Sequence, residues 1–178
     1  MNTLRLLAAG IFGLLACVAR AEDDVYQAPE RFLEETFVEA SGVPNPQLVW
    51  LTKEAREQVR AILGHDYPSM RIRYWWAGAR TAWILEEVGK TKPITMGLVV
   101  AGGRLERVKV LIYRESHGWE VKYPFFTDQF NGLGLDESGR LSRPIDGISG
   151  ATLSVNALTK LGRLALFLDA FVRKAQAP

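Results

Sequence analysis

The amino-acid sequence predicts an α+β fold, in which an antiparallel β-sheet is flanked by N-terminal helices and a long C-terminal helix. The middle of the chain carries four short segments rich in Ile, Val, Trp and Tyr, and the short turns between them favour antiparallel neighbours. Apolar residues at helical spacing precede these segments, and a longer run of the same kind follows them. Helices that lie before and after a set of strands are typical of the α+β class.

Two helices are expected before the strands. The first spans residues 29–40, since Pro29 suits a first helical turn and an apolar stripe follows, made of Phe32, Leu33 and Phe37 with Val38 at its edge. Residues 41–46 have the composition of a loop. The second helix begins after Thr52, which is a suitable N-cap, and ends at Gly64.

The predicted strands cover residues 70–76, 82–87, 94–101 and 105–113. The Gly102-Gly103 pair between the last two is a strong signal for a two-residue hairpin turn. Along the last strand, alternation predicts that Val108, Val110 and Ile112 share the core face. Trp75 and Trp76 are adjacent in a strand, so their side chains should point to opposite faces.

The last helix has the clearest pattern in the chain. Its apolar residues fall on one face, at positions Leu158, Leu161, Leu164, Ala165, Leu168, Phe171 and Val172. Arg173 and Lys174 lie near its C-terminal end, where positive charge is favourable. This helix should pack on the sheet and carry Thr152 at its N-terminal end.

The N-terminus has the features of an export signal. Arg5 is followed by an apolar run over residues 6–15 and by the cleavage pattern Ala19-Arg20-Ala21. The apolar run is short for a membrane span. We therefore expect a signal peptide at residues 1–21 and a single mature domain at 22–178, in the periplasm or on the outer face of the cytoplasmic membrane. Cys17 ends a passable lipobox, so lipidation at this cysteine is the alternative.

The charge of the mature chain excludes one class of partner. The full chain has 22 basic and 20 acidic residues, and residues 1–21 contain Arg5, Arg20 and no acid, so the mature chain carries 20 of each. With no basic excess, nucleic acid is not an expected partner. The two histidines are far apart in the sequence and the mature chain lacks cysteine, so no metal site is predicted.

The most informative segment lies directly before the last helix. It reads Asp146-Gly147-Ile148-Ser149-Gly150-Ala151-Thr152. Small residues in a turn at a helix N-terminus can hold a phosphate on backbone N–H groups. The segment also resembles the flavinylation motif of the FMN-binding domain family, with its acidic residue, two spacers and Ser-Gly-Ala-Thr. The resemblance implies that a flavin transferase esterifies the Thr152 hydroxyl to the FMN phosphate, with Asp146, Gly147, Ser149, Gly150 and Ala151 around the attachment point.

A second segment strengthens this resemblance. Glu115-Ser116-His117-Gly118 is similar to a Glu-Thr-Pro-Gly segment that lines the flavin in the family's respiratory members, the FMN-bearing subunits of Na⁺-pumping quinone reductase and of a related electron-transport complex. This implies flavin contacts from Glu115, Ser116 and Gly118, whereas His117 departs from the pattern. His117 is either a proton donor near the flavin or a solvated turn residue. Gln129-Phe130-Asn131-Gly132 resembles a further element of the family.

The resemblance implies an exported flavoprotein that carries FMN and transfers electrons from a membrane-bound redox partner, more an electron carrier than a stand-alone enzyme. Three other interpretations remain open. Ser149 or Thr152 could simply cap the helix. The chain could be a flavin-free periplasmic binding or assembly module. A serine hydrolase is disfavoured, because a nucleophile elbow at Ser149 needs a downstream histidine and both histidines lie upstream.

Overall fold

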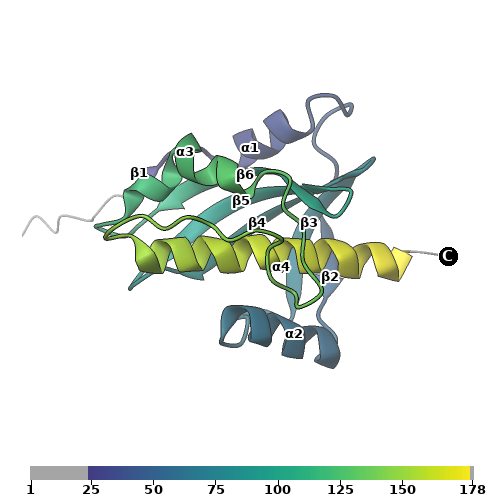
Figure 1. Ribbon diagram of the computed structural model, residues 1–178. Coiled ribbons are helices and arrows are strands. Elements are labelled where there is room, and N and C mark those ends of the chain that lie inside the picture. The colour runs from purple at the N-terminus through teal and green to yellow at the C-terminus, as the bar shows by residue number, and fades with distance from the viewer. Residues whose placement is uncertain (1–23, 177–178) are drawn as a thin grey trace, which may run out of the picture.

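The computed structural model describes residues 24–176, which contain one six-stranded sheet in the order β1-β6-β5-β4-β3-β2 (Figure 1). All neighbouring strands are antiparallel. The strands are β1 (Asp24–Val25), β2 (Gln47–Trp50), β3 (Arg71–Ala77), β4 (Arg80–Val88), β5 (Pro93–Ala101) and β6 (Arg104–Tyr113). The predicted α+β class is confirmed. Strands β3 to β6 match the four predicted strands to within two residues, whereas β1 and β2 had not been predicted.

The helices of this region are α1 (Pro29–Thr36), α2 (Lys53–Leu63), α3 (Pro124–Thr127) and α4 (Thr152–Gln176), with short 3-10 turns on either side of α3. The second and last helices agree with prediction. Thr52 caps α2 by accepting a 3.2 Å hydrogen bond from the Ala55 N–H, and Gly64 ends it in the left-handed conformation. The first helix is shorter than predicted: it ends at Thr36, and Val38 is 78% exposed in the turn that follows.

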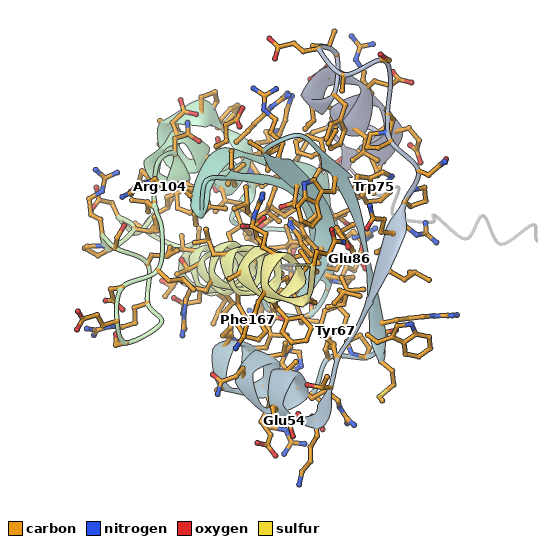
Figure 2. All side chains as sticks on the ribbon, turned by 90° about the vertical axis from the view of Figure 1, so that its right-hand side faces the viewer. Glu54, Tyr67, Trp75, Glu86, Arg104 and Phe167 are labelled. Carbon is orange, nitrogen blue, oxygen red and sulfur yellow. The ribbon has the colours of Figure 1, made fainter. Side chains whose placement is uncertain are left out.

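The sheet is covered differently on its two faces. Figure 2 shows it curving around α4, and the main core lies between α4 and the sheet, with α2 packed beside them. Helix α1 packs on the opposite face. There Phe32 lies so close to Gly97 that a Cβ at Gly97 would come within 2.8 Å of its ring. Trp76 packs against the main core and Trp75 against the α1 cluster, which confirms that they point to opposite faces.

Strand β6 departs from simple alternation. Its register with β5 shifts by one residue between the pairs Met96–Val110 and Thr95–Ile112, which places Leu111 in a β-bulge. Val108 and Val110 face the main core as predicted, but Ile112 packs against the α1 cluster together with Leu111. The bulge restores Tyr113 to the α4 side, at the point where β6 leads into the Glu115–Gly118 loop.

The described part of the chain contains no helix long and apolar enough to cross a membrane. The expected signal peptide at residues 1–21 and the alternative lipidation at Cys17 lie outside the described residues. Within residues 24–176 there is also no group of three or more His, Cys, Asp or Glu side chains placed to hold a metal ion.

Candidate functional site

A cavity of about 430 Å³ lies at the N-terminal end of α4. Its walls come from three parts of the chain: the β4–β5 turn, the loop after β6, and the start of α4. The lining residues are Lys90, Glu115, Ser116, His117, Gly150, Ala151, Thr152, Leu153 and Ser154. The fold therefore brings together the two segments that the sequence singled out, although 27 residues lie between Gly118 and Asp146 along the chain.

The start of α4 is built for an anion. The Ala151 N–H donates to Ile148 O at 3.0 Å and closes a tight turn, in which Gly150 has a φ of +81°. The first hydrogen bond of the helix follows, in which the Val155 N–H donates to Ala151 O at 2.9 Å. Ala151 therefore holds the N-cap position, where its methyl side chain accepts no hydrogen bond. The N–H groups of the first turn lack intrahelical partners and carry the positive end of the helix dipole.

Thr152 and Ser154 differ in ways that matter for chemistry. Thr152 is exposed, and its hydroxyl makes no hydrogen bond within residues 24–176. Ser154 is only 4% exposed, and its hydroxyl lies 2.9 Å from the Tyr113 hydroxyl. Thr152 does not hold the N-cap position, and its hydroxyl makes no hydrogen bond within residues 24–176. The interpretation of this residue as a simple helix cap is therefore not supported.

Tyr113 fastens the loop after β6 to the start of α4. Its hydroxyl donates to His117 O at 2.5 Å and also contacts Ser154. Burial raises the pKa of Tyr113, so the hydroxyl keeps its proton as a donor. Gly118 is buried in the same contact: a Cβ there would lie 3.0 Å from both hydroxyl oxygens and 3.2 Å from the Ala151 Cβ. The loop thus packs directly against the helix N-terminus.

Glu115 organises the opposite wall of the cavity. Its carboxylate accepts hydrogen bonds from the backbone N–H groups of Lys90, Thr91 and Lys92, at 2.5 to 2.9 Å, and from the Thr91 hydroxyl at 3.1 Å. Burial opposes the charge on Glu115, but the three backbone hydrogen bonds outweigh it and hold the pKa of the carboxyl below its ordinary value. This anchored turn places Lys90 on the cavity wall.

The remaining predicted residues lie around the cavity rather than on its walls. Asp146, Gly147 and Ser149 are exposed on the loop that leads into the Gly150 turn. The Asp146 N–H donates to the Gln129 side-chain oxygen at 2.7 Å, which ties this loop to the Gln129-Phe130 segment. The Asp146 carboxylate accepts no backbone N–H group within residues 24–176, so it does not fix this turn by hydrogen bonding.

Lys90 and Tyr113 contribute to the site but carry no local signal in the sequence. Lys90 lies in an ordinary polar turn, and only the long-range bonds from Glu115 bring it to the cavity. Tyr113 reads as the last residue of a strand. His117, which the sequence left open as a proton donor, is exposed on the cavity wall with its Nδ1 at 3.0 Å from the Ser116 hydroxyl.

The site fits a phosphate-bearing cofactor. The volume is within the usual range for cofactor pockets, and no atom lies within 4 Å of a Cβ built at Gly147 or Gly150, so a large group can approach the turn. The first-turn N–H groups and Lys90 supply positive charge for a phosphate. Ser149 forms no hydrogen bond with a histidine within residues 24–176, which further disfavours a serine hydrolase.

Comparison with protein-family models matches residues 89–166 to the FMN-binding domain. Neither the curated proteins nor the solved structures that were compared with the chain gave a match. The matched segment contains every residue that lines the cavity, and it argues against a flavin-free module. Residues 89–166 therefore belong to the FMN-binding domain family, and the chain is a flavin-binding protein whose cofactor is FMN.

Proposed function

We propose that the protein carries FMN covalently, through a phosphoester to the Thr152 hydroxyl, and transfers electrons between redox partners outside the cytoplasm. The observation that carries this proposal is the position of Thr152. Thr152 lies at the N-terminal end of α4 and on the wall of the cavity, and its hydroxyl is exposed and makes no hydrogen bond within residues 24–176. Ser154 is excluded as the acceptor because it is buried and bonded to Tyr113.

Attachment needs a second protein. A threonine hydroxyl is a weak nucleophile, and the cavity offers no base in contact with it, so a flavin transferase must supply FMN with an activated phosphate. The Thr152 oxygen would then form the new bond to the FMN phosphorus and lose its proton. The bond between that phosphorus and the activating group of the FMN donor would break, and the activating group would leave with the electron pair. In the product, the first-turn N–H groups and Lys90 offset the remaining negative charge of the phosphodiester.

When bound, FMN supplies the redox chemistry, and the protein's own residues hold and orient it. Glu115 fixes the β4–β5 turn and so keeps Lys90 at the cavity. Tyr113 and Gly118 keep the loop against the helix start. Ser116 and His117 on that loop form the part of the wall available to the flavin ring.

The location and partners follow from the N-terminal sequence. A signal peptide over residues 1–21 would deliver the mature chain to the periplasm or to the outer face of the cytoplasmic membrane, where lipidation at Cys17 is the alternative to cleavage. The partners that we propose are the flavin transferase and a membrane-bound redox protein. Nucleic acid is not among them, since the mature chain has no basic excess.

The test is to co-express the protein with a flavin transferase and look for flavin fluorescence after denaturing electrophoresis, together with the intact mass. We expect Thr152→Ala to remove both the fluorescent band and the added mass of one FMN, and Thr152→Ser to retain part of them. Thr159→Ala is the matched control that should label normally, because the Thr159 hydroxyl lies further along α4 and donates to Val155 O. A labelled Thr152→Ala protein would refute the assignment.

A further inference from the structure

A second cavity, of about 460 Å³, lies between the middle of α4 and the loop that precedes it. Figure 1 shows this loop, residues 131–150, running beside α4. Part of it is a tight hairpin in which Asp136 N–H donates to Arg140 O at 2.8 Å and Ser142 N–H donates to Gly134 O at 2.9 Å. The walls carry three arginines, Arg140 and Arg143 from the loop and Arg163 from α4, but only one carboxylate, Asp136.

Two of these arginines are held in place without an acidic partner. Arg163 Nε donates to Gly139 O at 2.9 Å, and an Arg143 Nη donates to Gln129 O at 3.1 Å. Neither forms a salt bridge within residues 24–176. A guanidinium has five N–H donors, so one hydrogen bond to a carbonyl orients it and leaves most donors and the whole charge available.

The single carboxylate does not neutralise the cavity. Asp136 accepts hydrogen bonds from the Ser138 hydroxyl and the Arg140 backbone N–H, which hold the pKa of its carboxyl below the ordinary value, and it lies 3.6 Å from Arg140 Nε. One carboxylate against three guanidinium groups leaves an excess of two positive charges. Like charges on one cavity wall repel, and an anion between them removes that repulsion.

A purely structural role for these arginines explains less. A neutral side chain such as glutamine could equally donate to a carbonyl and fix the loop, without the repulsion between neighbouring cations. The cavity also offers what an organic ligand needs beside its charges, namely the apolar side chains of Leu141, Pro144 and Ile145. We propose that this cavity binds a small organic dianion, a dicarboxylate or a phosphate monoester, through the guanidinium forks of Arg143 and Arg163.

The proposed site lies next to the first cavity, at the N-terminal end of α4, which is called the flavin cavity from here on. Thr159 and Arg163 follow Thr152 by seven and eleven residues on α4, so all three lie on one face of the helix. Thr159 is on the wall of the second cavity, about 10 Å along the helix axis from Thr152. Gln129 also connects the two sites, since its carbonyl accepts from Arg143 while its side chain accepts from the Asp146 N–H. A bound dianion would therefore act on the loop that leads into the Gly150 turn.

The test is calorimetric titration of the Thr152→Ala protein with succinate and with glycerol 3-phosphate, in a buffer without competing multivalent anions. This variant keeps the second cavity and separates the result from flavin attachment. We expect saturable one-site binding of at least one probe, and the two arms distinguish the dicarboxylate from the phosphate source. Arg143→Gln and Arg163→Gln should each weaken binding about tenfold or more, and Arg163→Lys less, because it keeps the charge but loses the fork.

The matched control is Arg60→Gln, which removes an arginine of α2 that is paired with Asp66 and does not line the cavity. It should bind like the parent protein. Circular dichroism melting of every variant distinguishes lost binding from lost folding. The proposal is overturned if neither probe shows saturable binding to the folded parent, or if Arg60→Gln weakens binding as much as the two cavity variants do.

Discussion

Gly118 shows how one residue without a side chain joins the two halves of the flavin site. Its φ is +86°, and any Cβ would meet the Tyr113 and Ser154 hydroxyls and the Ala151 methyl group at 3.0 to 3.2 Å. Gly118→Ala should therefore lower the free energy of unfolding by about 1–3 kcal/mol through backbone strain and crowding. It should also slow flavin loading, because the crowded atoms belong to the start of α4.

Urea unfolding measures the first effect, and the rate of FMN incorporation measures the second. Gly147→Ala is the control, since Gly147 has an ordinary φ and no atom lies within 4 Å of the added Cβ. It should change the stability by less than about 0.5 kcal/mol. If Gly118→Ala proves as stable as Gly147→Ala, the close packing of the loop on α4 is not what makes glycine necessary.

Lys90 tests the electrostatics of the same site. It is exposed on the cavity wall, whereas Lys92, two residues away in the same turn, does not line the cavity. Lys90→Gln should slow FMN incorporation about fivefold at low salt, because one positive charge near the phosphate is lost. Lys92→Gln should leave the rate unchanged. The difference should shrink as salt is added, and equal effects of both variants at all salt concentrations would show that only net charge matters.

At the level of elements, His65 and Glu87 form a contact, here called the histidine clamp, that connects the end of α2 to strand β4. His65, just after α2, places its Nε2 3.0 Å from the buried Glu87 carboxylate on β4, which also accepts from Lys160 of α4 at 3.3 Å. The hydrogen bond to Asp66 O and the bond to Glu87 raise the pKa of His65 above its ordinary 6.5. The protonated imidazole therefore stabilises the packing of α2.

The sign of the pH dependence follows. A folded-state pKa above the unfolded value gives stability that is fully present below pH 6.5 and is lost as pH rises through the folded pKa. We expect the free energy of unfolding to fall as the pH rises from about 6.5 through the folded-state pKa of His65. The effect should be small, because His65 is half exposed. His65→Gln should flatten the profile and His117→Gln should not, and a parent profile that rises over this range would contradict the clamp.

The elements also show which features were predictable. Strands β3 to β6, helix α2 and helix α4 follow from period, caps and turn glycines, which are local properties. The edge strand β2 was missed because it is four residues long, follows two prolines and pairs with β3 only through tertiary contact. Ile112 was placed on the wrong face because the bulge at Leu111 depends on the register with β5 and not on the sequence of β6 alone.

The same distinction holds for the site. The motif around Thr152 and the Glu115–Gly118 segment were found because each carries its pattern within a few residues. Their meeting at one cavity was implied only by resemblance, and Lys90 could not be found at all. Its position depends on a carboxylate 25 residues further along the chain, which accepts from three consecutive backbone N–H groups. Such a contact leaves no period or spacing to detect.

At the scale of the whole molecule, the beginning of the described chain and the flavin site lie at the same end. Figure 1 places β1 and the start of α4 at one end and the C-terminus at the other. Strand β1 pairs with the last residues of β6, where Asp24 lies opposite Tyr113, the residue that holds the flavin loop. A lipid at Cys17 would thus hold the flavin site close to the membrane surface, and cleavage after Ala21 would leave it free to diffuse between partners.

This architecture leads to the last prediction, that the protein carries electrons and turns over no small substrate by itself. The flavin cavity, of about 430 Å³, is within the usual range for cofactor pockets, and the proposed attachment through the phosphate at Thr152 would leave the ring accessible to a transient partner. We expect chemically reduced holoprotein to be reoxidised by membranes of the native host under anaerobic conditions. Absorbance of the flavin follows the reaction, with heat-treated membranes as the control.

The second cavity adds an arm to this experiment. A dianion bound there, beside Thr159 on α4, could be either an effector or a substrate. Reduced holoprotein alone should not be oxidised by the oxidised counterparts of succinate and glycerol 3-phosphate, fumarate and dihydroxyacetone phosphate, because the two cavities have no lining residue in common. The same anions should instead change the rate with membranes, and Arg163→Gln should remove that change. Inert membranes combined with saturable oxidation by a soluble metabolite would identify the protein as an enzyme and end the carrier interpretation.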